Sequence, residues 1–245
     1  MTAQEIAQAA TQGYEWTAFS DREALAETLA DRVAQTLSAA IERRGAGFLA
    51  VSGGTTPGRF FAALSSRPIA WDKVTVTLVD ERFVPPSSPR SNAALVADTL
   101  LRNAASAARF APLYHAAESA DAAALAAEAE LATLPWPLDA AVLGMGTDGH
   151  TASFFPDADT LPDLLNPHNA RIVLPVEAAG AGEPRLTLSM PRLTGAGFLA
   201  LHIEGAEKRA VFEAAMQAAI QGDDRKPIRA VIEASPRPVN VFWAP

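Results

Sequence analysis

The stretch GFLAVSGGTTPGRFF, residues 47–61, contains the pattern that decides the fold. Residues 48–51 form a short apolar run with the length and composition of a buried strand. A turn with two adjacent glycines follows, and Phe60 and Phe61 then begin a segment that we expect to be helical. A strand, a glycine-rich turn and a helix in this order are typical of α/β proteins with a mostly parallel sheet.

The same alternation extends along the chain in both directions. A strand is expected over residues 14–19, followed by a helix that Ser20 and Glu23 begin as a capping box and Gly45 ends. Later helices are expected at about 93–101, 120–134 and 206–220, and strands at 74–79, 140–143, 171–176, 186–190, 197–203 and 239–243. Residues 1–10 fit either a loose terminus or a short helix. We therefore predict one Rossmann-like domain over residues 1–245, a mostly parallel central sheet with helices on both faces.

The composition narrows the possible functions. The chain has 28 acidic and 20 basic residues and a net charge of −8, which argues against nucleic-acid binding but leaves a small anionic substrate open. It has no cysteine, so disulfides and thiolate chemistry are excluded. There is no signal-peptide pattern and no apolar run near the about 18 residues of a membrane span. We expect a cytoplasmic protein without membrane contact, a monomer or small homo-oligomer.

Glycine and polar residues are concentrated where four of the expected strands end. They occupy residues 52–57, 80–82, 144–150 and 205–208. Ligands of open parallel sheets bind beyond the carboxyl ends of the strands. We therefore expect these four segments to converge on one site, which is the main indication of an enzyme.

The first of these segments suits a phosphate group. Gly53 and Gly54 let successive backbone N–H groups point at one anion, and Ser52 and Thr55 add hydroxyl donors. The following helix would contribute the positive end of its dipole. An ordinary tight turn between a strand and a helix is the alternative.

The second segment places three charges, Asp80, Glu81 and Arg82, after an apolar strand. Arg82 is suited to bind phosphate through its planar guanidinium, with Asp80 or Glu81 orienting it or acting on the substrate. A local salt-bridge cluster is the alternative. Farther on, Asn92 is either part of a helix cap or a hydrogen-bond partner for sugar hydroxyls.

The third segment, residues 144–150, is the most informative. Gly146 and its neighbouring glycines permit close backbone approach around Asp148 and His150. Histidine titrates near neutral pH, so His150 is the candidate general base, at the start of an expected helical turn through Phe155. The other histidines, His115, His168 and His202, are interpreted as structural or surface residues. Four dispersed histidines without a helical His-Glu-His pattern argue against a metal site.

These segments, in this order, resemble the 6-phosphogluconolactonase family. The resemblance covers about residues 47–209, with a weaker match at 239–243. The matching stretches are SGGTTP at 52–57, DERFVP at 80–85 with SN at 91–92, GMGTDGHTAS at 144–153 with FP at 155–156, PRLTL at 184–188 and GAEK at 205–208. Phe154 and Asp157 depart from the leucine and glycine usual there, which concerns loop conformation more than chemistry.

The resemblance implies a lactone hydrolase of the oxidative pentose phosphate pathway that needs no cofactor. In this reading His150 activates water, with Asp148 beside it. The implied phosphate contacts are Arg82, Lys208 and the 52–55 turn, and Arg185 is a further candidate for substrate contact. Backbone N–H groups of residues 144–149 are candidate donors to the developing oxyanion.

Two other functions are compatible with parts of the pattern. Glucosamine-6-phosphate deaminases share the fold, but they typically have Asp-Glu-Tyr where this chain has Asp80-Glu81-Arg82, and they continue the Gly-His turn differently. A non-catalytic sugar-phosphate sensor is the second alternative. Such sensors need a DNA-binding module or a partner surface, and this acidic chain has no spare segment for either.

Overall fold

The centre of the computed structural model, which describes residues 13–217 and 226–245, is a seven-stranded sheet. The strand order is β1-β10-β9-β6-β2-β3-β5, and all neighbouring pairs are parallel. The strands are β1 (Tyr14–Ala18), β2 (Gly47–Val51), β3 (Val74–Leu78), β5 (Arg109–Phe110), β6 (Ala140–Leu143), β9 (Phe198–Glu204) and β10 (Val239–Ala244). The predicted mostly parallel α/β sheet is confirmed, and the two-residue strand β5 was not predicted.

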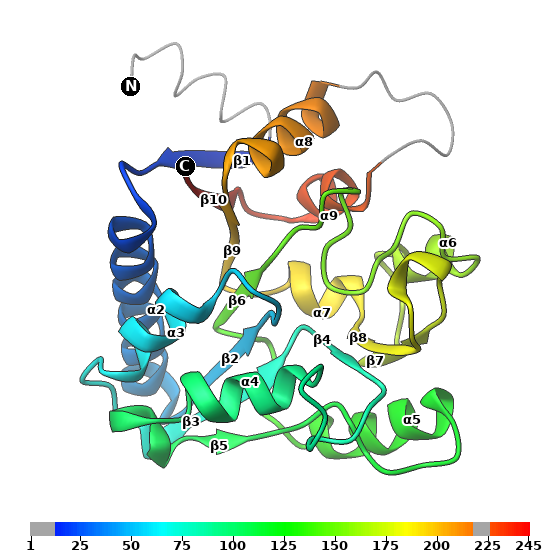
Figure 1. Cartoon of the computed structure of the whole chain (residues 1–245). Helices are drawn as coiled ribbons and strands as arrows, with labels where there is room; N and C mark the ends of the chain where they lie inside the picture. The colour runs from blue at the N-terminus through cyan, green and yellow to red at the C-terminus, as the bar shows by residue number, and fades with distance from the viewer. Residues whose placement is uncertain (1–12, 218–225) are drawn as a thin grey trace.

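Helices lie on both sides of this sheet. In Figure 1, α2 and α3 lie to the left of β2, β6 and β9, whereas α7 and α9 lie to the right. The helices are α2 (Arg22–Arg44), α3 (Gly58–Ser65), α4 (Asn92–Thr99), α5 (Ala120–Leu131), α6 (Leu161–Leu164), α7 (Met190–Thr194), α8 (Ala206–Gln217) and α9 (Pro227–Ala234). Among the described residues, no helix has the length and apolar character needed to cross a membrane. The expectations for residues 1–10 and for the end of the helix at 218–220 lie outside the described residues.

The start of α2 differs from the prediction by one residue. Asp21, not Ser20, caps the helix, because its Oδ1 accepts a hydrogen bond from the N–H of Ala24 at 2.8 Å. The Ser20 hydroxyl instead donates to Asp21 Oδ2 at 2.9 Å. A carboxylate is as good a cap as a hydroxyl, so two adjacent candidates compete and the sequence alone does not decide between them. The predicted end is confirmed: Gly45 has a φ of 78° and its N–H donates to Ile41 O.

A second, three-stranded antiparallel sheet was not predicted. It has the order β4-β8-β7, with β4 (Asp80–Arg82), β8 (Arg185–Leu188) and β7 (Val173–Val176). The segments 171–176 and 186–190 were expected in the central sheet, and residues 80–82 were expected to follow a strand rather than to form one. Val79 joins the sheets: its N–H donates to Val51 O in the central sheet, and its carbonyl accepts from Leu188 N. Strand pairing of this kind links distant segments and leaves no local signature.

The core positions the carboxyl ends of the central strands. Strands β2 and β6 are buried along their whole length, and Phe48, Phe60 and Phe61 are among the largest fully buried side chains. Burial on both faces explains why these strands read as continuous apolar runs. Because the strands are parallel, the turns that follow β2, β3, β6 and β9 lie at the same edge of the sheet.

Candidate functional site

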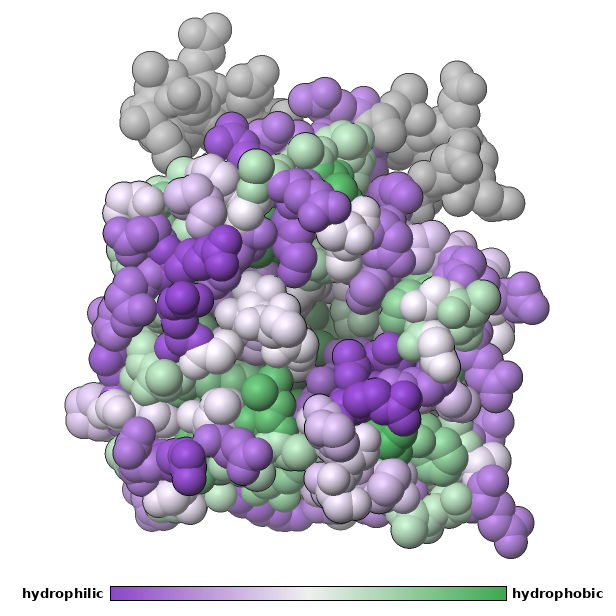
Figure 2. All heavy atoms as spheres, in the orientation of Figure 1, coloured by the Kyte–Doolittle hydropathy of each residue, from purple (hydrophilic) through white to green (hydrophobic). Residues whose placement is uncertain are grey.

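A cavity of about 270 Å³ lies at that edge, which limits a ligand to a small molecule. In the space-filling view a hollow lies near the middle of the face, with hydrophilic residues on its rim (Figure 2). Every predicted site residue except Asp148 lines the cavity: Ser52, Gly53, Gly54, Thr55, Asp80, Arg82, Asn92, Gly146, His150, Arg185 and Lys208. The predicted convergence of the four segments therefore occurs in the structure.

The charge of this lining is opposite to that of the whole chain. Arg82, Arg185 and Lys208 line the cavity, and Asp80 is the carboxylate among the lining residues. The chain as a whole has a net charge of −8. Positive charge concentrated in a concave, partly desolvated site attracts anions whatever the sign of the whole protein.

The 52–57 turn is shaped by close contact with another segment. A Cβ atom on Gly53 would lie 1.9 Å from Oδ1 of Asn92, so only glycine leaves room for that side chain. Asn92 is held in place because its Nδ2 donates to the carbonyl of Asp80 at 2.9 Å. Gly54 has a φ of +86°, a conformation that glycine adopts without strain. The turn thus has a defined shape and is braced against β4 and α4.

The end of this turn carries further anion-binding groups. Lys208, in the first turn of α8, places its Nζ 3.3 Å from the hydroxyl of Thr56. Burial lowers the pKa of Lys208, and the charges of Glu204 and Glu207 oppose this effect. Helix α3 begins directly after Pro57 without a side-chain cap. Its first N–H groups are therefore available to a ligand at the mouth of the turn.

Glu81 has a structural role rather than a place in the cavity. Its buried carboxylate accepts hydrogen bonds from the Ser91 hydroxyl at 3.0 Å and from the N–H groups of Arg82, Asn92 and Ala93, each at 2.7 Å. Burial raises the pKa of Glu81, although these hydrogen bonds act to lower it. The carboxylate anchors the start of α4, where Ser91 is the N-cap. Ser91 is therefore the helix cap and Asn92 lines the cavity, and the contact of Asn92 with sugar hydroxyls stays a prediction.

Arg82 and Arg185 lie opposite each other on β4 and β8. Each donates once to a backbone carbonyl, Arg82 to Arg90 O at 2.6 Å and Arg185 to Ala181 O at 2.8 Å. The Nε atoms of both are buried and have no hydrogen-bond partner among the described residues. Burial lowers the pKa of Arg185; Asp80 opposes this effect and Arg82 adds to it. Two adjacent guanidinium groups with unused donors form a site for an anion.

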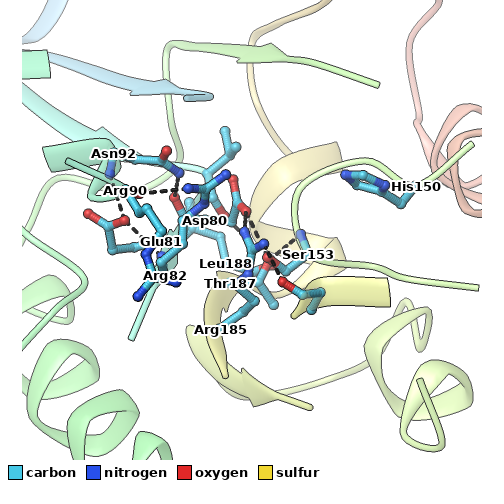
Figure 3. A network of polar contacts seen from close by, with 12 residues as sticks. Asp80, Glu81, Arg82, Arg90, Asn92, His150, Ser153, Arg185, Thr187 and Leu188 are labelled. Atoms are coloured by element: carbon cyan, nitrogen blue, oxygen red, sulfur yellow. Dashed lines mark hydrogen bonds and ion pairs between the residues drawn. The ribbon is translucent and has the colours of Figure 1, made fainter. Parts of the chain in front are cut away.

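The alternative of a local salt-bridge cluster is not what the structure contains. Within the described residues Arg82 forms no ion pair with Asp80 or Glu81. Asp80 instead accepts a hydrogen bond from the Ser153 hydroxyl at 2.7 Å, and its Oδ2 lies 4.0 Å from Arg185. Figure 3 shows this network running from Glu81 to Ser153, with His150 set apart from it. Asp80 therefore links the arginine pair to the segment that carries His150.

The 144–150 turn holds His150 through its neighbours. The Nδ1 atom of His150 lies 2.6 Å from Oδ1 of Asp148, which also accepts from the His150 N–H at 3.1 Å. A Cβ on Gly146 would lie 2.3 Å from the imidazole ring, so glycine is required there. Burial acts to raise the pKa of Asp148, but hydrogen bonds and charge from His150 outweigh it and hold the pKa below its usual value. Asp148 is thus ionised beside the imidazole.

This arrangement leaves the second ring nitrogen of His150 for chemistry. Its Nδ1 faces Asp148, so Nε2 is the atom able to accept a proton. The ring packs 4.4 Å from that of Phe155 and the side chain remains partly exposed at the cavity. The geometry is that of a general base oriented by a carboxylate.

One expectation about this segment is wrong, and a second applies to fewer groups than expected. Residues 151–155 do not form a helical turn; Thr151 and Phe154 form an antiparallel bridge around Ala152, whose φ is +49°. Of the candidate oxyanion donors at 144–149, the N–H groups of Gly146 and Gly149 are already used, and the others stay candidates. These two groups donate within the turn, to His150 O at 3.0 Å and to Gly146 O at 3.1 Å. Both results follow from the need of the buried backbone to satisfy its own polar groups.

Several lining residues, among them Gly180 and His202, were missed by sequence reasoning. His202, interpreted as structural or surface, is 2% exposed on β9 and lines the cavity. The sequence feature that could have identified His202 as a site residue is its position near the end of an apolar strand, just before the 205–208 segment. His115 and His168, by contrast, are not among the residues that line the cavity.

Comparison with known proteins places this chain in one family. Residues 20–243 match the family model of glucosamine-6-phosphate isomerases/6-phosphogluconolactonase. The chain is 65% identical to the 6-phosphogluconolactonase of Mesorhizobium japonicum, covering 95% of this chain and 96% of that protein. It is 55% identical to that of Rhizobium meliloti, covering 93% and 97%.

A solved structure agrees with these matches. The crystal structure of a 6-phosphogluconolactonase from Shewanella baltica superposes with a TM-score of 0.90 at 36% identity, covering 95% of this chain and 98% of that chain. The similarity thus extends over nearly the whole chain and its fold. The chain therefore belongs to the 6-phosphogluconolactonase family.

Proposed function

We propose that the protein hydrolyses 6-phospho-D-glucono-1,5-lactone to 6-phospho-D-gluconate, within the oxidative pentose phosphate pathway and without a cofactor. One observation carries this proposal: an imidazole oriented by a carboxylate shares a small cavity with several anion-binding groups. The relatives named for this activity support the choice of substrate.

The substrate phosphate binds to the cationic lining. The 52–55 turn, Lys208 and Arg82 supply backbone, hydroxyl and charged donors for it, and Arg185 and Asn92 are available for other substrate oxygens. Fixing the phosphate places the lactone ring relative to His150 and removes much of the entropy cost of reaction.

The lactone carbonyl is then attacked by water. Nε2 of His150 takes a proton from the water as its oxygen bonds to C1, forming a tetrahedral intermediate. The bond from C1 to the ring oxygen breaks, and the imidazolium returns the proton to that departing oxygen. The product is the open-chain acid, which ionises to a carboxylate. Asp148 stabilises the transient imidazolium through its 2.6 Å contact with Nδ1.

A lactone ester is reactive enough to need no covalent nucleophile. The protein has to hold the phosphate, orient the water and stabilise developing negative charge. These needs correspond to the groups that line the cavity.

The direct test follows lactone decay. 6-Phosphogluconolactone is generated from glucose 6-phosphate, and its loss is measured with the protein, with a His150→Ala variant and with neither. We expect fast hydrolysis with the wild-type protein alone. Rates equal to the spontaneous one with both proteins contradict the proposal. Release of ammonia from glucosamine 6-phosphate would favour a deaminase, and tight sugar-phosphate binding without turnover would favour a sensor.

A further inference from the structure

His202 occupies the cavity without a role in the chemistry proposed above. Its side chain is 2% exposed, yet it lines the cavity together with Thr56 and Lys208. A buried imidazole in an apolar strand costs free energy unless its nitrogens have partners. The position of those nitrogens therefore indicates what the residue does.

Strand register and a ring contact locate His202 within the cavity. Leu201 pairs with Leu143, so His202 stands one residue beyond, level with the start of the 144–150 turn. Its ring packs edge-on against Phe60 of α3, with centroids 6.3 Å apart. Phe60 lies on α3, directly after the 52–57 turn, and Lys208 contacts Thr56 in that turn. The imidazole thus packs against α3 and lines the same cavity as the 52–57 turn.

One nitrogen of His202 is already bound. Its Nε2 lies 3.2 Å from Oε1 of Glu204, whose other oxygen lies 3.3 Å from Nε of Arg22 on α2. The Glu204 side chain is 9% exposed, and the charges of Arg59 and Lys208 also act on it. Glu204 is therefore a fixed, ionised partner that sets the orientation of the ring.

The other nitrogen of His202 is unused. Among the described residues no hydrogen-bond partner is present for Nδ1, although the ring is almost fully buried and borders the cavity. With Nε2 bound to a carboxylate, a proton on Nδ1 makes the ring an imidazolium, which a second anion on the cavity side would stabilise.

We propose that His202 is a phosphate-binding residue, in which the imidazolium bridges the Glu204 carboxylate and the phosphate group of the substrate. The inference rests on the proposed function, and it assigns to this site a donor beyond the turn, Lys208 and Arg82. Glu204 acts as a positioning residue, because it holds Nε2 and leaves Nδ1 without a partner among the described residues. A phosphate dianion is then paired with charges from β9 and α8 as well as from β4.

Spectroscopy of the wild-type protein tests the contact without a mutation. The imidazole nitrogens are labelled with ¹⁵N and the protein is titrated with inorganic phosphate and with 6-phospho-D-gluconate. The His202 signals are assigned by their absence in a His202→Gln variant. We expect the Nδ1 resonance of His202 to move to its protonated, hydrogen-bonded position with both ligands. An unchanged His202 resonance at saturating ligand overturns the proposal.

Calorimetry and kinetics then measure how much His202 contributes to ligand binding. We expect His202→Gln to weaken binding of 6-phospho-D-gluconate about tenfold and to raise KM similarly, with little change in kcat. The matched control is His168→Gln, which alters a loop histidine outside the cavity. Unchanged affinity in a folded His202→Gln protein, or loss of kcat rather than affinity, contradicts a phosphate contact.

These outcomes are separable from failure of the proposed function. If the wild-type protein hydrolyses no lactone but the His202 resonance responds to phosphate, the activity is wrong and the phosphate contact stands. If hydrolysis is fast and the resonance does not respond, the activity stands and the contact is wrong.

Discussion

The Nδ1 atom of His150 lies 2.6 Å from Oδ1 of Asp148, two residues earlier on the same turn. Oδ1 of Asp148 contacts Nδ1 of the His150 ring and also accepts a hydrogen bond from the backbone N–H of His150. These two contacts fix the position of the ring relative to the carboxylate. The missing Cβ of Gly146 makes room for it. This pair is the part of the site on which the proposed chemistry depends most directly.

Replacing His150 by alanine removes the proposed general base. We expect His150→Ala to lower kcat by about 10²–10⁴-fold, the usual contribution of a general base, with a modest change in KM. Lactone decay under saturating substrate measures this effect. A kcat equal to that of the wild-type protein would remove His150 from the mechanism.

Removing only the orienting charge has a smaller effect. Asp148→Asn keeps the size of the side chain but no longer stabilises an imidazolium, so we expect kcat to fall by less than it does in His150→Ala. The double variant should be no slower than His150→Ala, because both residues act in one step. Additive losses in the double variant would show that Asp148 acts elsewhere.

Arg82 is expected to act in binding. Loss of a charged hydrogen-bond donor costs about 1.5–3 kcal/mol, so Arg82→Ala should raise KM by about tenfold to 100-fold with kcat less affected. Arg102→Ala, which removes an exposed arginine outside the cavity, is the matched control. A wild-type KM in the Arg82 variant is incompatible with a phosphate contact.

The lowered pKa of Lys208 leads to a prediction of how affinity for the ligand depends on pH. An amine is charged below its pKa, and burial lowers the pKa of Lys208, so the charge is lost at a lower pH than for an ordinary lysine. Affinity for 6-phospho-D-gluconate should therefore fall as the pH rises from about 7 to 10. In Lys208→Arg the guanidinium stays charged, and the fall should be much weaker. Calorimetry at several pH values measures both, and a parallel decline in the two proteins contradicts this role.

Substitution of Glu81 is expected to lower the stability of the fold and not the catalytic rate directly. Glu81→Ala leaves the three N–H groups and the hydroxyl that it binds without their acceptor, and we expect the free energy of unfolding to fall by about 3 kcal/mol or more. Urea unfolding compares this variant with Glu42→Ala on the exposed face of α2, where the change should stay within about 0.5 kcal/mol. Similar values for the two variants would show that the buried carboxylate is dispensable.

Local patterns in the sequence were sufficient for six of the seven strands of the central sheet and for most of the residues that line the cavity. The apolar run at 48–51, the glycines at 53 and 54 and the glycine-rich turn around His150 each specify backbone conformation within a few residues. Because parallel strands run in one direction, their carboxyl ends lie at the same edge of the sheet. The sequence therefore predicted which segments would be neighbours in the cavity. The resemblance to a family added the individual roles.

The tertiary structure alone decided which distant groups face each other. The β4–β8 pairing that sets Arg82 opposite Arg185, the burial of Glu81 under α4 and the contact of His202 with Glu204 and Phe60 were not predicted. Each depends on strand register, or on which face of an element meets its neighbour, and neither is encoded in a short window of residues. The sequence by itself determined the turns and the residues they carry. Long-range packing determined which polar atoms are paired and which remain free to bind a ligand.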